Sequence, residues 1–171
     1  MAELTTKEKL QPSLLDRLTD EEPQRKQESR DRRVLSLRRL RQCVLRDLEW
    51  LLNAGSLAAT QDLEDYPLVR RSVLNYGMPE LAGCFASNVD IRAVEQGLRQ
   101  AILDFEPRIL PGTVQVRAIV SQDAMDHNAL AFEIEGEVWA QPLPEKLLLK
   151  TEIDLENGAV TVVEKPGRRP G

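Results

Sequence analysis

The chain has 171 residues, of which 42% are hydrophobic and 30% are charged, and its formal net charge at pH 7 is −5. This composition is ordinary for a soluble globular protein and predicts one compact domain. No apolar run approaches the roughly 20 residues that span a bilayer, and residues 1–10 lack the basic start and apolar run of a secretory signal, so we expect a cytoplasmic protein without direct membrane insertion.

Residues 1–30 are predicted to form a flexible N-terminal arm that contains one short apolar anchor. The segment is polar and charged, and it is interrupted by Pro12 and Pro23. Within it, Leu14, Leu15 and Leu18 would form a small apolar face if the segment became helical. That face could fold back on its own domain or dock into a groove of a partner, and the sequence leaves both alternatives open.

The longest predicted element is a helix over 31–53, because its apolar residues recur every three or four positions. They are Val34, Leu37, Leu40, Val44, Leu48 and Leu51. Residues 30–46 contain seven arginines and one acid, a local charge of +6. A basic helix suggests a nucleic-acid adaptor, but aromatic residues make up only 4% and no nucleic-acid motif occurs. We therefore expect no nucleic-acid partner, and the arginines form either a solvated face or a contact with an acidic protein surface.

A second helix is predicted over 91–105, where a stripe of apolar residues follows Asp90. An acid at this position lies at the positive end of the helix dipole and favours a helix start there, and Ser87 or Asn88 could cap the helix. Between the two helices, Tyr66-Pro67 and the stretch 72–79 combine proline-limited turns with short apolar pieces. These features predict a structured connection.

The hydrophobic period changes to two after Pro111-Gly112. Alternation predicts strands over 114–120, 130–138 and 147–153, and Asn157-Gly158 predicts a hairpin turn into a last strand over 159–164. Helices followed by a small antiparallel sheet with a C-terminal hairpin define an α+β fold. We expect this single domain to cover 31–164, with a flexible tail over 165–171.

The bend at Glu106-Pro107-Arg108 lies between the helical and strand-rich halves of the chain. Proline disfavours the helical conformation of the preceding residue, so the helix should end at this bend. In one alternative, Glu106 and Arg108 form an ion pair that fixes the bend. In the other, Arg108 is displayed for recognition of a partner, since a guanidinium group offers five donors in a flat fork. Spacing alone does not decide between these two roles.

Few residues could carry catalytic chemistry. Cys43 and Cys84 have no metal-ligand spacing, and the single histidine, His127, cannot form a cluster. No acid pair stands out as a glycosidase pair, and the acids, Asp47 among them, are expected on solvated surfaces. We therefore expect no catalytic residues, no metal and no cofactor, with a cell-wall glycosidase as the less favoured alternative.

Five separated motifs, taken in order and spacing, resemble the TssE family, the type VI secretion baseplate subunit related to tailed-phage baseplate wedge proteins with a historical lysozyme label. The motifs are Leu14-Leu15-Asp16-Arg17-Leu18, the stretch 44–53, Tyr66-Pro67, the stretch 72–77 and the stretch 105–109. The resemblance runs from about Pro12 to Glu164. Two departures are Ile109, where the family usually has leucine, and Ala54-Gly55, which replaces Thr-Arg.

The resemblance implies a cytoplasmic structural protein without enzymatic activity. Such a protein joins other baseplate wedge subunits around the inner tube and provides the platform on which the contractile sheath begins to polymerise. It also implies that Glu106, Pro107 and Arg108 lie at the assembly interface.

The last predicted strand suggests how the sheath subunits would attach. Val160, Val162 and Val163 form a proline-free stretch that would lie at the edge of a small sheet. An exposed edge can pair with a strand from a neighbouring chain. We therefore expect partner contacts at Val160 and Val162 by strand addition.

Overall fold

The computed structural model describes residues 13–19, 24, 37–84, 89–119, 128–140 and 143–165. Its helices are α1 (Leu14–Leu18), α2 (Leu37–Asn53), α3 (Pro67–Arg70) and α4 (Ile91–Phe105), with 3-10 turns η3 (Leu57–Ala59), η4 (Val73–Asn75) and η6 (Pro111–Thr113). The strands are β1 (Gln115–Ile119), β2 (Ala129–Val138), β3 (Glu145–Asp154) and β4 (Val160–Glu164). Helices followed by an antiparallel sheet confirm the predicted α+β class.

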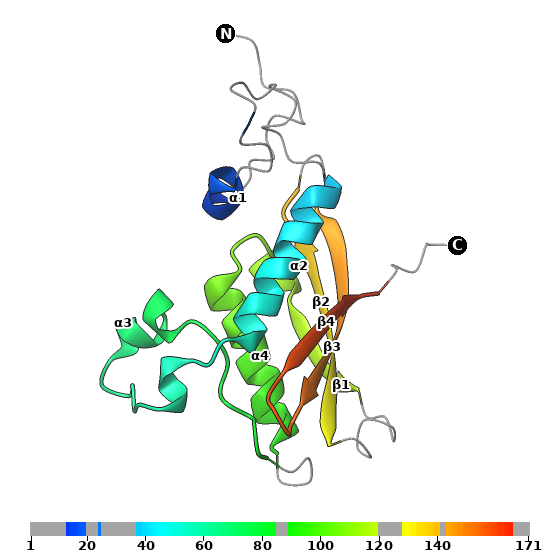
Figure 1. The fold of residues 1–171 in the computed structure, drawn as a ribbon. Coiled ribbons are helices and arrows are strands. Elements are labelled where there is room, and N and C mark those ends of the chain that lie inside the picture. The colour runs from blue at the N-terminus through cyan, green and yellow to red at the C-terminus, as the bar shows by residue number, and fades with distance from the viewer. Residues whose placement is uncertain are drawn as a thin grey trace.

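The four strands form an antiparallel meander in the order β1-β2-β3-β4. The register places Ile134 between Val116 and Leu149, and Thr151 between Phe132 and Val162. Helices α2 and α4 cover one face of this sheet (Figure 1), α2 on the side of β4 and α4 on the side of β1. The result is a two-layer domain whose core lies between the helices and the sheet.

The core uses the alternate strand residues and the apolar helix stripes that the periodicity predicted. Its fully buried members include Leu48, Leu98, Ile102, Phe132, Ile134, Leu149 and Ile153. Two stripe residues differ, because Leu37 at the start of α2 and Ile91 at the start of α4 remain 37% and 36% exposed. The first turn of α2 thus extends past the core, whose first helix member is Leu40. Residues 31–36 of the predicted helix lie outside the described part of the chain.

Helix α4 begins and ends where the sequence predicts, and the residue that caps its start is Asp90. Ser87 and Asn88, the expected caps, lie outside the described residues. The Asp90 carboxylate accepts hydrogen bonds from the backbone N–H groups of Arg92 and Ala93, which satisfies two free donors at the helix start. At the other end Glu106 has left the helical conformation, with φ −120° and ψ 77°, as expected for a residue before proline. The bend that carries the Glu-Pro-Arg motif is therefore fixed by the covalent structure of Pro107.

The predicted hairpin at Asn157-Gly158 is also confirmed. Gly158 has a φ of 75°, and the backbone N–H of Asp154 donates to the carbonyl of Ala159 at 2.9 Å. The turn leads directly into β4, which pairs with β3 and is the last strand of the sheet. The turn therefore places β4 at an edge.

Parts of the predicted arm and tail, and the histidine, are not covered. Residues 1–12, 20–23, 25–36 and 166–171 lie outside the described residues, so the boundaries of the arm and tail stay predictions. His127 also lies outside them. Among the helices that the structure does describe, none combines the length and apolar character needed to cross a membrane.

The connection between α2 and α4 is ordered by a close backbone contact. Met78 donates its N–H to the Ala54 carbonyl at 2.7 Å, and Ser56 donates to the Met78 carbonyl at 2.9 Å. Gly77 makes this approach possible, because its φ is 124° and an added Cβ would lie 2.3 Å from the Ala54 oxygen. The stretch 72–79 is thus a structured connection, as predicted.

We expect Gly77→Ala to lower the free energy of unfolding by more than the ~1–3 kcal/mol of backbone strain alone, because the new methyl group would also collide with backbone atoms that follow α2. Gly83→Ala is the matched control, since Gly83 also has a positive φ, 78°, but an added Cβ there would meet nothing within 4 Å. Denaturant unfolding of both variants measures the difference. Equal destabilisation would contradict a role for the close contact.

Candidate functional site

The Glu-Pro-Arg bend is part of a larger group of charged side chains. We call it the charge cluster, and it consists of Asp16, Arg46, Asp47, Glu106 and Arg108. The Arg108 Nε donates to Glu106 Oε1 at 2.7 Å, and its Nη2 contacts both Glu106 Oε2 and, at 2.6 Å, Asp47 Oδ2. Glu106 has only 4% of its side chain exposed and Arg108 has 22%. The guanidinium group therefore joins the bend to α2.

The cluster continues from Asp47 to the N-terminal arm. Arg46 donates from Nε to Asp47 Oδ1 at 2.8 Å, and its Nη1 lies 2.8 Å from Asp16 Oδ1. The guanidinium carbon of Arg46 also lies 5.0 Å from the ring centroid of Trp50, a cation–π distance. A chain of alternating charges thus connects helix α1 to the bend after α4.

Helix α1 docks through this acid and leaves its leucines exposed. Asp16 has 4% of its side chain exposed, whereas Leu14, Leu15 and Leu18 are 71%, 45% and 74% exposed. Ser13 caps the short helix and donates to the Asp16 carboxylate at 2.6 Å. Helix α1 is therefore held to α2 through Asp16, which pairs with Arg46, and not through its leucine face. For that face, folding back on the domain and docking into a partner both stay predictions.

The local pKa shifts follow from burial opposed by these contacts. Burial disfavours the charged form of Arg108, but hydrogen bonds and charge from Glu106 and Asp47 outweigh it and raise its pKa. Burial likewise opposes ionisation of Asp16, but hydrogen bonds from Ser13, Arg46 and Cys43 and the Arg46 charge lower its pKa below 3.8. Burial and the neighbouring Asp16 raise the pKa of Cys43. Arg108 and Asp16 therefore stay charged at neutral pH, and the Cys43 thiol stays protonated.

Not every donor in the cluster is satisfied. Nη1 of Arg108 is buried and has no hydrogen-bond partner in the described part of the chain. A buried donor without an acceptor costs free energy. This unpaired Nη1 therefore offsets part of the stability that the other bonds of Arg108 provide.

Aromatic side chains from two of the recognisable motifs border the cluster. Tyr76 and Phe105 pack edge to face, with ring centroids 5.3 Å apart. Burial, together with the charges of Asp47 and Glu106, raises the pKa of Tyr76. The segments containing Asp16, Asp47, Tyr76 and Arg108 are thus separate in sequence but meet at one site.

Part of this site was not predicted from the sequence. Asp47 was expected on a solvated helix face, which is wrong, because Asp47 bonds Arg46 and Arg108 and is only 22% exposed. A solvated face was also one of the two alternatives for the arginines of the basic helix. Two of them instead make ion pairs within the chain: Arg41 pairs with Glu145 and Glu164, and Arg46 lies in the charge cluster. The spacing of Asp16 and Arg46 carried no usable signal, because the two residues are far apart in the chain and nothing local to either specifies the other.

The predicted edge-strand residues lie on β4. Val160 is 7% exposed and Val162 is half-buried, and both side chains lie on the helix-covered face of the sheet. Their backbone groups lie at the border of the sheet, since β4 has only β3 as a neighbour. Arg41 of α2 pairs with Glu164 at the far end of this strand.

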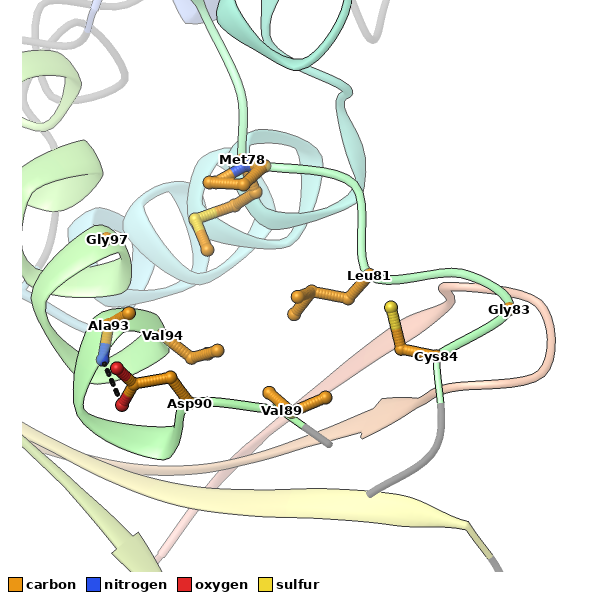
Figure 2. Close-up of a pocket in the computed structure, with 10 residues that line it drawn as sticks. Met78, Leu81, Gly83, Cys84, Val89, Asp90, Ala93, Val94 and Gly97 are labelled. Atoms are coloured by element: carbon orange, nitrogen blue, oxygen red, sulfur yellow. Dashed lines mark hydrogen bonds between the residues drawn. The ribbon is translucent and has the colours of Figure 1, made fainter. Parts of the chain in front are cut away.

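An apolar cavity of about 400 Å³ lies between the stretch 78–84 and the first turns of α4. Figure 2 shows Met78, Leu81, Cys84, Val89 and Val94 around it, with the Asp90 carboxylate bonded to the backbone of α4. This carboxylate already accepts hydrogen bonds from the backbone N–H groups at the start of α4, as the helix cap. Within the described residues no group of three or more histidine, cysteine, aspartate or glutamate side chains could hold a metal ion.

The fold and the site define a class of protein: a small two-layer α+β domain with an ion cluster joining arm, helix and bend, and with a sheet edge at its border. The family model of baseplate wedge protein gp25 matches residues 38–143, more than half of the chain. The chain belongs to this family of structural baseplate proteins, which includes TssE.

The match covers α2 through β2 and confirms the resemblance to the TssE family. It supports a structural role in a phage-like or type VI secretion baseplate, in contact with other baseplate components. Comparison with curated proteins and comparison with solved structures gave no significant match.

Replacing Arg108 with alanine should lower the free energy of unfolding by about 3–5 kcal/mol, because it leaves the buried Glu106 and Asp47 without their shared cation. The melting temperature should fall by roughly 6–20 °C. The melting temperature of Arg108→Lys should lie between those of the wild type and Arg108→Ala, since one ammonium group cannot reproduce the planar fork of a guanidinium group. Arg117→Ala is the control, because the Arg117 side chain donates to Gln115 on its own strand. Equal melting temperatures of Arg108→Ala and Arg117→Ala would show that the charge cluster does not stabilise the fold.

Lowering the pH should release α1 before the domain unfolds. Because the pKa of Asp16 is lower in the folded state than its ordinary 3.8, the docking contributes stability above pH 3.8 and loses it as the pH falls through the folded value. NMR shifts of the Leu14 and Leu15 methyl groups measure docking, and the Phe132 ring resonances report the core. Asp16→Asn should show undocked shifts already at pH 7. Docked shifts in Asp16→Asn at pH 7 would show that this ion pair does not hold α1.

Proposed function

We propose that this protein is a structural subunit of a type VI secretion baseplate wedge in the cytoplasm, and that it starts contractile sheath polymerisation by strand addition. It joins other wedge subunits, around the inner tube, through the surface of the charge cluster, and it binds sheath subunits through β4. Family membership supports the baseplate role. The observation that supports strand addition is the position of β4, which has a neighbouring strand on one side only.

The wedge contact is supported by what surrounds the cluster. Leu14, Leu18 and Trp50 are 71%, 74% and 52% exposed, although they are large apolar side chains. Leu14 and Leu18 lie on the helix that Asp16 fixes, and Trp50 lies against Arg46. Exposed large apolar side chains near a partly buried arginine have the composition of a binding hot spot. Glu106, Pro107 and Arg108 hold this surface in place, and Pro107 is itself exposed.

The sheath contact is supported by the direction of the β4 backbone groups. The Asp154 N–H donates to the Ala159 carbonyl, and the Lys165 N–H donates to the Leu148 carbonyl, each at 2.9 Å. Ala159 and Lys165 thus direct these backbone groups toward β3. Because backbone groups alternate in direction along an antiparallel strand, the odd-numbered residues face β3 and Val162 faces away from it. A strand from a sheath subunit can therefore pair at Val162 without breaking the existing sheet.

Val162→Pro should leave the domain folded and abolish sheath assembly, because proline removes an N–H that points away from β3. Val162→Ala is the matched control, since it shortens the side chain but keeps the N–H, and it should still support assembly. Thermal melts establish folding, and the number and length of fluorescently labelled sheaths in cells measure polymerisation. Normal sheaths with a folded Val162→Pro protein would refute strand addition at β4.

The same experiment separates the two surfaces. Val162→Pro should still co-purify with wedge subunits, because it does not touch the charge cluster.

The double variant Leu14→Ser, Leu18→Ser should melt like the wild type, since both leucines are exposed, but should recover less wedge subunit in a pull-down. Each leucine that is fully buried in the contact would contribute about 1.5–3 kcal/mol. Undiminished recovery would remove α1 from the wedge interface.

A further inference from the structure

The two outer edges of the sheet differ in how completely side chains of the helices close them. Edge strands present unpaired backbone N–H and C=O groups, and proteins often cover them to prevent unwanted pairing. Here the outer edges belong to β1 and β4. On each, the groups that point away from the sheet belong to alternate residues, which in both strands are the even-numbered ones.

The β1 edge is closed at both ends by α4. The N–H of Ala118 donates to Glu95 Oε1 at 2.6 Å, and Arg99 Nε donates to the carbonyl of Val114 at 3.2 Å. Of the residues whose backbone groups point outward, only Val116 lies between these two positions. An incoming strand therefore finds one free residue on β1, too little for a ladder.

The β4 edge is closed at one end only, by the last residue of α2. Asn53 Nδ2 donates to the carbonyl of Val160 at 2.8 Å, and the Val160 N–H donates to Asn53 Oδ1 at 2.9 Å. Nδ2 also donates to the Glu49 carbonyl at 2.8 Å, so the orientation of the amide is fixed from its own helix. An amide has one donor side and one acceptor side, like a residue of a neighbouring strand. Asn53 therefore occupies the place that an added strand would take at Val160.

At the other end the contact with α2 leaves the backbone free. Arg41 bonds the Glu164 side chain and not its backbone groups. The next even-numbered position in the sequence is Pro166, outside the described residues, which has no N–H to donate. Among the described residues of β4, the outward donors that remain for an added strand are thus those of Val162 and Glu164.

We propose that Asn53 is the residue that sets the register of strand addition, by confining an incoming strand to Val162 and Glu164. This inference rests on the proposed function, because it assumes that a strand of a sheath subunit adds to β4. Register matters because a shift of one residue turns every side chain of the added strand to the opposite face. A two-residue window with a blocked end fixes where along β4 an added strand can pair, so each protein would present the same two positions to the sheath.

Residue-resolved hydrogen exchange of the full chain, alone and bound to purified sheath subunit, tests the proposal. In the wild type, Val160 N–H should be protected in both states, while Val162 N–H should become protected only in the complex. In Asn53→Ala, Val160 N–H should exchange about fivefold faster in the free protein, the factor expected for one lost hydrogen bond. It should then regain protection in the complex, because the added strand can now extend to that position.

The outcomes distinguish this inference from the function on which it rests. If Val162 N–H gains no protection in the wild-type complex, strand addition at β4 is wrong. If Val162 is protected but Val160 N–H of Asn53→Ala stays exposed in the complex, strand addition holds and Asn53 does not set its limit. Asn53→Asp is a second variant that keeps the acceptor for Val160 N–H, and its Val160 should stay protected in the free protein. Unprotected Val160 in a folded Asn53→Asp protein would overturn the assignment of the cap.

Glu95→Ala provides the control on the opposite edge. It should speed the exchange of Ala118 N–H in the free protein without changing the protection of Val162 in the complex. Loss of Val162 protection in this variant would show that the two edges do not act separately and would overturn the proposal.

Discussion

The Asp47 carboxylate lies between two guanidinium groups, and three separate parts of the molecule depend on that position. Arg46 carries the contact on to Asp16, which holds helix α1 against the domain. Arg108 carries it to Glu106, which fixes the bend after α4. Because these groups are partly withdrawn from water, loss of one member leaves its neighbours with uncompensated charge. The cluster is therefore a unit, and arm, helix and bend hold their mutual positions through it.

Helix α2 also connects the cluster to the sheet edge. Arg46 and Asp47 lie on the same continuous helix as Arg41 and Asn53, which contact Glu164 and Val160 at the two ends of β4. The core face of this helix is anchored by side chains that are fully buried, Val44 and Leu48. The surface that we propose for wedge subunits and the strand that we propose for the sheath are thus held at a fixed spacing. Such rigidity suits a subunit that connects two layers of an assembly.

Much of the fold was predictable because its signals are local. Asp90 caps the start of α4 with its own side chain, and Pro107 ends the helix through its ring. Asn157-Gly158 forms a turn for the same reason, since glycine accepts the positive φ that the turn requires. The exposure of Leu37 was not predictable, because periodicity identifies the apolar face of a helix but not how far the opposing sheet extends.

The sequence by itself determined the elements, their order, the bend at Glu106-Pro107-Arg108 and the family resemblance, because each depends on residues close together in the chain or on fixed motif spacing. Only the tertiary structure decided which charges meet. Arg108 and Asp47 are 61 positions apart, and nothing local to either residue specifies the other. The same holds for Asn53 and Val160, which are 107 positions apart. Such pairings arise only once the packing of apolar faces has set the helices against the sheet, so they follow from the fold as a whole.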